Sequence, residues 1–103
     1  MPYISESDRD ILNKHIDDLS SAIFSTKLDN NPHDFSQFLG AINYCFSRVL
    51  MRVMRSVSYS KIAMATGVLE NIKQEFYSRI ARSYEDQKIV ENGDIYEYKV
   101  WSK

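Results

Sequence analysis

The densest group of side chains suited to binding a ligand lies between residues 73 and 92. It combines tyrosine rings with arginine and lysine side chains and ends in an asparagine. Tyrosine can stack on a nucleobase, arginine can bind a phosphate through two parallel hydrogen bonds, and asparagine can read a base edge. The group therefore suits an anionic, base-containing ligand, and the candidate ligand-binding residues within it are Tyr77, Arg79, Arg82, Tyr84, Lys88 and Asn92.

Two further candidates lie in the middle of the chain. Asn43 offers a second amide for a base or ribose edge, and Arg48 begins a basic ridge that continues at Arg52 and Arg55. Steps of four and three place these arginines on one helix face. An alternative stays open for all of these residues, namely tyrosine packing within a helix bundle and arginine–glutamate pairs between subunits.

Catalytic and metal-binding patterns are missing from the sequence. It contains no Ser-His-Asp constellation, phosphate-binding loop, HExxH helix or glycine-rich dinucleotide motif. Cys45 and the two histidines lack neighbours at metal-ligand spacing. We therefore expect a protein that is not an enzyme and has no catalytic residue, no metal and no cofactor. A net charge of −1 also argues against nucleic-acid binding.

One long helix, residues 60–91, must position the residues of the ligand-binding group. Its apolar residues recur every three or four positions and form one stripe that requires a partner surface; they are Ile62, Ala65, Leu69, Ile72, Phe76 and Ile80. On regular helical geometry Lys73, Tyr77 and Tyr84 share a side. Gly67 inside this helix predicts close approach of another backbone.

Two shorter helices are expected before it. The first spans residues 8–25 with Ser7 as its cap, and the second spans 33–56 with Asn31 as cap and Pro32 in its first turn. The apolar residues of the second helix cover more than one stripe, which indicates an oligomer interface. Residues 94–103 alternate apolar and polar side chains and predict an extended, strand-like tail.

These elements predict an all-α fold: one domain, residues 1–103, built as a small antiparallel three-helix bundle with an extended C-terminal tail. We expect it to form homo-oligomers. The sequence shows no secretory signal, no apolar run that could cross a membrane and one cysteine, so we expect a cytoplasmic protein. Residues 41–82 carry seven bases against two acids, while both flanking regions are acidic. Such segregation fits contacts between segments or subunits, or an anionic ligand at the basic centre.

Several segments resemble a family of short uncharacterised proteins found in phages and prokaryotes. The resemblance covers nearly the whole chain and rests on Met1–Ile4, Ile42–Tyr44, Gly67–Glu70, Lys73–Arg79 and Tyr84–Asp94. The last segment, YEDQKIVENGD, is the most specific. The Phe-rich segment 35–46 and the tail 97–103 depart from the family pattern.

The resemblance implies a phage protein acting in an infected bacterial host cell. By analogy with oligomeric phage sponges, it implies anti-defence sequestration of a nucleotide-derived immune signal, of the cyclic oligonucleotide or cyclic ADP-ribose type, without cleavage. The expected partners are then the protein itself and a small anionic nucleotide. The alternative is a non-enzymatic module that binds a host or phage protein through its helical surface.

Overall fold

The computed structural model describes residues 4–27 and 34–101, and within these ranges every regular element is a helix. The chain divides into an N-terminal unit, Met1–Arg55, and a C-terminal unit, Ser56–Lys103. The prediction of an all-α fold is confirmed.

Helix α1 spans Glu6–Phe24 and begins two residues earlier than the sequence predicts. Its cap is Ser5 rather than Ser7, because the Ser5 Oγ accepts a hydrogen bond from the Asp8 backbone N–H at 3.3 Å. That contact satisfies one of the free N–H groups of the first turn. Glu6 and Asp8 add negative charge where the helix dipole favours it.

The second predicted helix consists of a 3-10 helix, Phe35–Phe38, followed directly by α2, Leu39–Met54. The expected cap Asn31 and first-turn residue Pro32 lie outside the described residues. Helix α2 ends two residues before the predicted boundary, because Arg55 takes a left-handed φ of 67° and donates its N–H to the Met51 carbonyl at 3.1 Å. A positive φ stops regular helix propagation.

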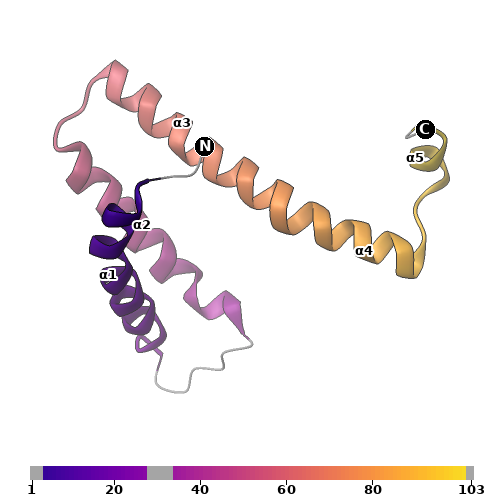
Figure 1. Ribbon diagram of the computed structural model, residues 1–103, viewed down its shortest axis with the longest axis horizontal. Helices are drawn as coiled ribbons and strands as arrows, with labels where there is room; N and C mark the ends of the chain where they lie inside the picture. The colour runs from indigo at the N-terminus through magenta and orange to yellow at the C-terminus, as the bar shows by residue number, and fades with distance from the viewer. Residues whose placement is uncertain (1–3, 28–33, 102–103) are drawn as a thin grey trace. The chain divides into compact units, whose positions relative to one another are not determined.

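The N-terminal unit is organised around Phe38, which is 3% exposed and is the one buried side chain among the described residues. The ring of Phe24, at the end of α1, meets the Phe38 ring edge-on with centroids 5.2 Å apart. Helices α1 and α2 thus lie side by side (Figure 1). The broad apolar surface predicted for α2 is present and largely open to solvent: Leu39, Phe46, Val49 and Val53 are each more than half exposed.

The C-terminal unit contains one unbroken helix from Tyr59 to Asn92 (Figure 1), within one residue of the predicted bounds at each end. It comprises α3, Tyr59–Phe76, a π-helical turn, Tyr77–Ala81, and α4, Arg82–Asn92. Ser58 caps its start by accepting from the Lys61 N–H at 3.1 Å. Gly93 ends it with a φ of 83°, as the Asn-Gly pair predicts.

The π turn is a feature that the sequence analysis did not predict. The Arg82 N–H donates to the Tyr77 carbonyl, a bond to the fifth preceding residue instead of the fourth. One extra residue is therefore held in that turn, and every later side chain rotates by about 100° relative to a regular α-helix. The prediction that Tyr77 and Tyr84 lie on the same side assumed a regular α-helix. The π turn begins at Tyr77 and ends before Tyr84, so that assumption does not hold.

The prediction of an extended tail is wrong for residues 96–101, which form helix α5, Tyr96–Trp101. The Lys99 N–H donates to the Ile95 carbonyl at 3.2 Å, a helical bond, and the Asp94 carboxylate accepts from the Ile95 N–H. A lone strand leaves its backbone groups unpaired, whereas a helix pairs them locally. The alternation of residue types over five positions was therefore a weaker determinant of structure than local pairing of the backbone hydrogen-bond groups.

Removal of the Phe38 ring should destabilise the N-terminal unit. Phe38→Ala is expected to lower the free energy of unfolding by about 3 kcal/mol, because a buried aromatic ring loses its contacts and leaves a cavity. Urea titration followed by circular dichroism, at fixed protein concentration, measures the change. Phe35→Ala is the matched control: Phe35 lines the same pocket but is 63% exposed, so its loss should cost about 1 kcal/mol or less. Equal effects of the two variants would contradict the assigned core.

A second stability prediction concerns Gly67. Among residues 4–27 and 34–101, nothing lies within 4 Å of a Cβ added at this position, so this part of the chain supplies no closely approaching backbone. Gly67→Ala should raise the free energy of unfolding by about 1 kcal/mol, since glycine is a poor helix former. A loss of stability would instead mean that another molecule's backbone packs against Gly67.

Candidate functional site

Tyr77 is the centre of the first group of candidate residues. Its phenol donates a hydrogen bond to the Glu85 Oε1 at 3.2 Å, and the Arg82 guanidinium lies over its ring, 5.9 Å from the centroid. Residues five apart diverge on a regular α-helix, but the additional residue of the π turn brings them to successive turns of one face. The π turn therefore assembles this group of a ring, a cation and a carboxylate.

Tyr84 and Lys88 form a second group one turn further along α4. The Lys88 Nζ lies 5.4 Å from the centroid of the Tyr84 ring, and the same nitrogen pairs with the Glu91 carboxylate at 3.2 Å. Arg79, on the π turn, pairs with Glu75 at 2.7 Å. Each of the three predicted phosphate-binding cations of this helix thus already has an aromatic or acidic partner.

These partners determine what the cluster can bind. Glu75 and Glu91 pair with Arg79 and Lys88, and Glu85 adds a third negative charge beside Tyr77, so the helix surface is close to neutral. Exposed ion pairs contribute only about 0–1 kcal/mol each, so a phosphate can replace a carboxylate at small cost. The surface can accept an anion in direct contact. Because its net charge is close to zero, it attracts a distant anion only weakly.

The remaining predicted residues occupy other places. Asn92 is the last residue of α4. In the N-terminal unit, the Asn43 Oδ1 accepts from the Ser47 Oγ at 3.2 Å. Arg48 lies over the Tyr44 ring at 5.6 Å and donates to the Tyr44 hydroxyl at 3.3 Å. The structure brings together Tyr77 with Arg82 and Tyr84 with Lys88.

The candidate ligand-binding residues predicted from the sequence do not include Tyr44 and Glu85. A signal for Tyr44 was present, because Tyr44–Arg48 and Tyr84–Lys88 share the pattern of a tyrosine followed four residues later by a cation. On a helix that spacing places a cation beside a ring. Glu85 gave no such signal, since its hydrogen bond to Tyr77 depends on the π turn.

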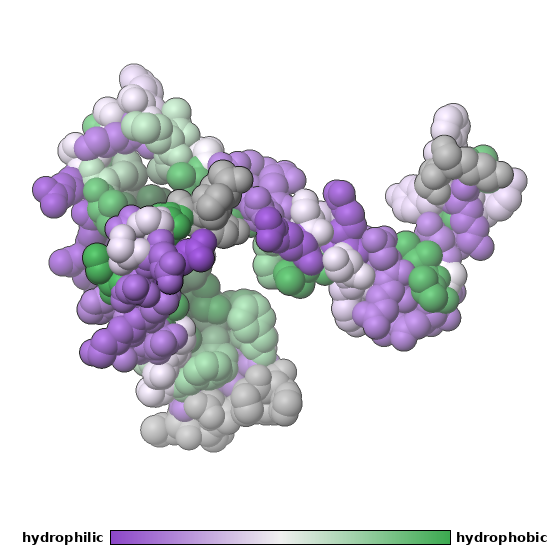
Figure 2. Space-filling model, viewed as in Figure 1, coloured by the Kyte–Doolittle hydropathy of each residue, from purple (hydrophilic) through white to green (hydrophobic). Residues whose placement is uncertain are grey.

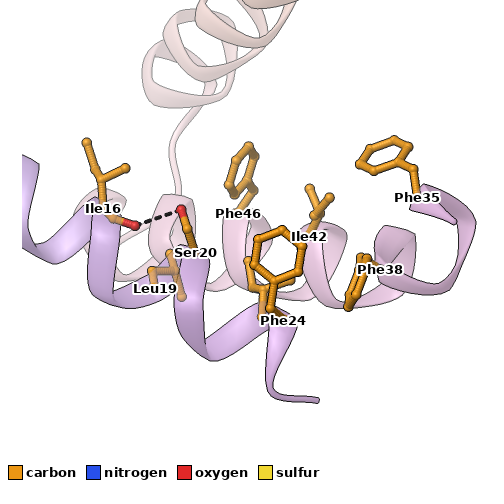
Figure 3. Close-up of a pocket in the computed structure, with 9 residues that line it drawn as sticks. Ile16, Leu19, Ser20, Phe24, Phe35, Phe38, Ile42 and Phe46 are labelled. Atoms are coloured by element: carbon orange, nitrogen blue, oxygen red, sulfur yellow. Dashed lines mark hydrogen bonds between the residues drawn. The ribbon is translucent and has the colours of Figure 1, made fainter. Parts of the chain in front are cut away.

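A pocket of about 480 Å³ lies in the N-terminal unit and is of a different kind (Figure 3). Aromatic and aliphatic side chains from α1, the 3-10 helix and α2 line it: Ile16, Leu19, Ile23, Phe24, Phe35, Phe38, Ile42 and Phe46, together with Ser20. The Ser20 hydroxyl donates to the Ile16 carbonyl at 2.8 Å and is thereby satisfied. Since none of the described side chains that line it is charged, the pocket suits an apolar group and not a phosphate.

Within residues 4–27 and 34–101, no three His, Cys, Asp or Glu side chains gather closely enough to hold a metal ion. In the same part of the chain, no helix combines the length and apolar character that crossing a membrane requires.

Comparison with known proteins places the chain in a family. No curated protein and no solved structure matches it. A family model described as a domain of unknown function, DUF6899, matches residues 1–95. The match includes both tyrosine–cation groups of the long helix and ends just before α5. The chain therefore belongs to the DUF6899 family.

Proposed function

We propose that this protein is a non-catalytic binding protein that captures a small anionic nucleotide and holds it without cleavage. The observation that carries the proposal is the repeated pairing of an exposed tyrosine ring with a cation, at Tyr77–Arg82, Tyr84–Lys88 and Tyr44–Arg48. Rings and cations within 6 Å of each other match the two halves of a nucleotide, its base and its phosphate.

The chemistry of capture follows from these pairs. A base can stack on the tyrosine face opposite the cation, while its phosphate takes the hydrogen-bond donors that now face glutamate. Tyr77 and Tyr84 are 46% and 59% exposed, so part of each ring is open for such stacking. Asn92, at the end of the same helix, supplies an amide for a base or ribose edge.

One helix surface cannot enclose a ligand by itself. Sites that hold small molecules tightly are concave and bury most of the ligand's surface. The Tyr77–Arg82 and Tyr84–Lys88 groups lie on the exposed surface of the long helix, so tight capture requires a second surface that closes over them. A homo-oligomer supplies that surface from its own subunits, which is the assembly expected from the sequence.

The resemblance to short phage proteins supports a more specific proposal. The ligand would be a nucleotide signal of a bacterial immune system, of the cyclic oligonucleotide or cyclic ADP-ribose type, and capture would take place in the cytoplasm of the infected host cell. A sequestering protein lowers the free signal concentration by binding alone. It therefore requires no catalytic group, metal or cofactor.

The apolar pocket favours a second candidate function, a module that binds a host or phage protein. A pocket lined by four phenylalanines could receive an apolar side chain of a partner. In that case the tyrosine–cation pairs would serve only to stabilise α2 and α4.

Calorimetric titration of the full chain with cyclic dinucleotides and cyclic ADP-ribose isomers tests the binding proposal. Tyr77→Ala and Arg82→Ala should each weaken binding about tenfold or more, since base stacking on an aromatic ring contributes about 1–3 kcal/mol. Tyr59→Ala is the matched control: Tyr59 belongs to the same helix and is 94% exposed, and its loss should leave affinity unchanged.

Release of the ligand separates capture from catalysis. Heat denaturation of a complex should return the nucleotide intact, whereas an enzyme would return cleaved product. If the folded, assembled protein binds none of these nucleotides, the capture proposal fails and the protein-binding module becomes the better account.

A further inference from the structure

The apolar residues of α3 follow the seven-residue repeat of a coiled coil. Ile62, Ala65, Leu69, Ile72 and Phe76 are separated by three, four, three and four residues. These spacings correspond to the a and d positions of two consecutive heptads, the pattern by which one helix packs along another. We call this line of side chains the α3 seam.

The π turn extends the α3 seam beyond Phe76. Ile80 and Tyr84 follow Phe76 by four and eight residues, so in a regular heptad each would lie one residue out of phase. Because the π turn holds one extra residue, it returns both side chains to the seam. The hydrogen bond from Tyr77 to Glu85 agrees with this shift. In a regular heptad, side chains two turns apart on the same face are separated by seven residues, whereas Tyr77 and Glu85 are separated by eight.

The extended seam is open to solvent along its length. Ile62, Leu69, Ile72, Phe76, Ile80 and Tyr84 are between 45% and 62% exposed, and α3, the π turn and α4 contain no buried residue. Hydrophobic side chains are visible at the surface of this helix in Figure 2. With on the order of 100 Å² exposed at each large side chain, the seam offers roughly 600–700 Å², close to one partner's share of a standard protein interface.

Helix length decides which partner fits. The seam from Ile62 to Tyr84 is about 33 Å long at the α-helical rise, whereas α1 and α2, with 19 and 16 residues, are about 28 and 24 Å long. Among the described elements, the helix from Tyr59 to Asn92, at about 50 Å, is the one long enough to cover the whole seam. The matching surface is therefore the same helix in another copy of the chain.

We propose that two copies of the Tyr59–Asn92 helix pack along the extended α3 seam as a coiled coil, with the π turn absorbing the residue that interrupts the heptads. This self-association stands independently of any ligand. The position of the ligand site at this interface, by contrast, rests on the proposed function. Tyr84 lies in the seam, and Tyr77 and Arg82 lie beside it. Nucleotide capture would then occur along the junction between subunits.

Two single-residue deletions test the register. Deletion of Ser78 removes the extra residue of the π turn and should leave a regular heptad, so the assembled mass measured by sedimentation should persist. Deletion of Thr66 also removes one small hydroxyl residue from this helix, but it shifts Leu69, Ile72 and Phe76 by about 100° from Ile62 and Ala65. That variant should sediment at the monomer mass of 12.0 kDa, at concentrations where the wild type is assembled.

A pair of point variants tests the surface without altering the register. Ile72→Asp places a charge in the seam and should dissociate the assembly to monomers. Met64→Asp places the same charge on a side chain that is also exposed, 61%, but outside the seam, and should leave the mass unchanged. If both deletions or both point variants behave alike, the seam is not the interface. A wild-type chain that sediments at 12.0 kDa, with a melting temperature lowered by Ile72→Asp alone, would show that the same chain covers the seam and would overturn the proposal.

Discussion

Burial of apolar surface is the constraint on which this structure depends. A helix gains most of its stability in a protein by packing an apolar face, because short isolated helices are marginal in water. Among the described residues, that burial is complete at Phe38 alone, where α1 and the 3-10 helix meet. The helix from Tyr59 to Asn92 has an apolar seam with no buried residue. On the proposal above, a surface that packs against the seam supplies the missing burial, and the length and heptad spacing of the seam favour a second copy.

The π turn links this packing to the candidate ligand site. One extra residue between Phe76 and Arg82 keeps Ile80 and Tyr84 in the seam, and the same residue brings Arg82 and Glu85 to Tyr77. In the strict heptad of the proposed coiled coil, Ile80 and Tyr84 would otherwise lie one residue out of phase with Phe76. The proposed coiled coil and the Tyr77–Arg82 group therefore depend on the same local irregularity, and irregular turns of this type are frequent at functional sites.

Much of the fold could be predicted from residue spacing, because amphipathic periodicity determines which segments are helical and Gly93 determines where the long helix ends. Residue spacing does not distinguish Ser5 from Ser7, two residues further on, as the cap of α1. The π turn could not be predicted from the spacing of apolar residues. The same spacing fits a regular helix whose apolar stripe drifts around the axis and a helix that holds one extra residue in a turn. The prediction of an extended tail was wrong, because the alternation of apolar and polar residues over Tyr96–Val100 is also compatible with a short helix. Residue types identified the ligand-binding candidates, but the glutamates that offset their charge became evident only from the contacts in space.

The measurement that tests this account most directly is the thermal melting temperature of the wild-type chain as a function of its concentration, followed by circular dichroism. If a second copy covers the seam, folding and association are coupled, and the melting temperature should rise by a few degrees for each tenfold increase in concentration. A melting temperature that is independent of concentration over the micromolar range, for a fully helical chain, would contradict the account.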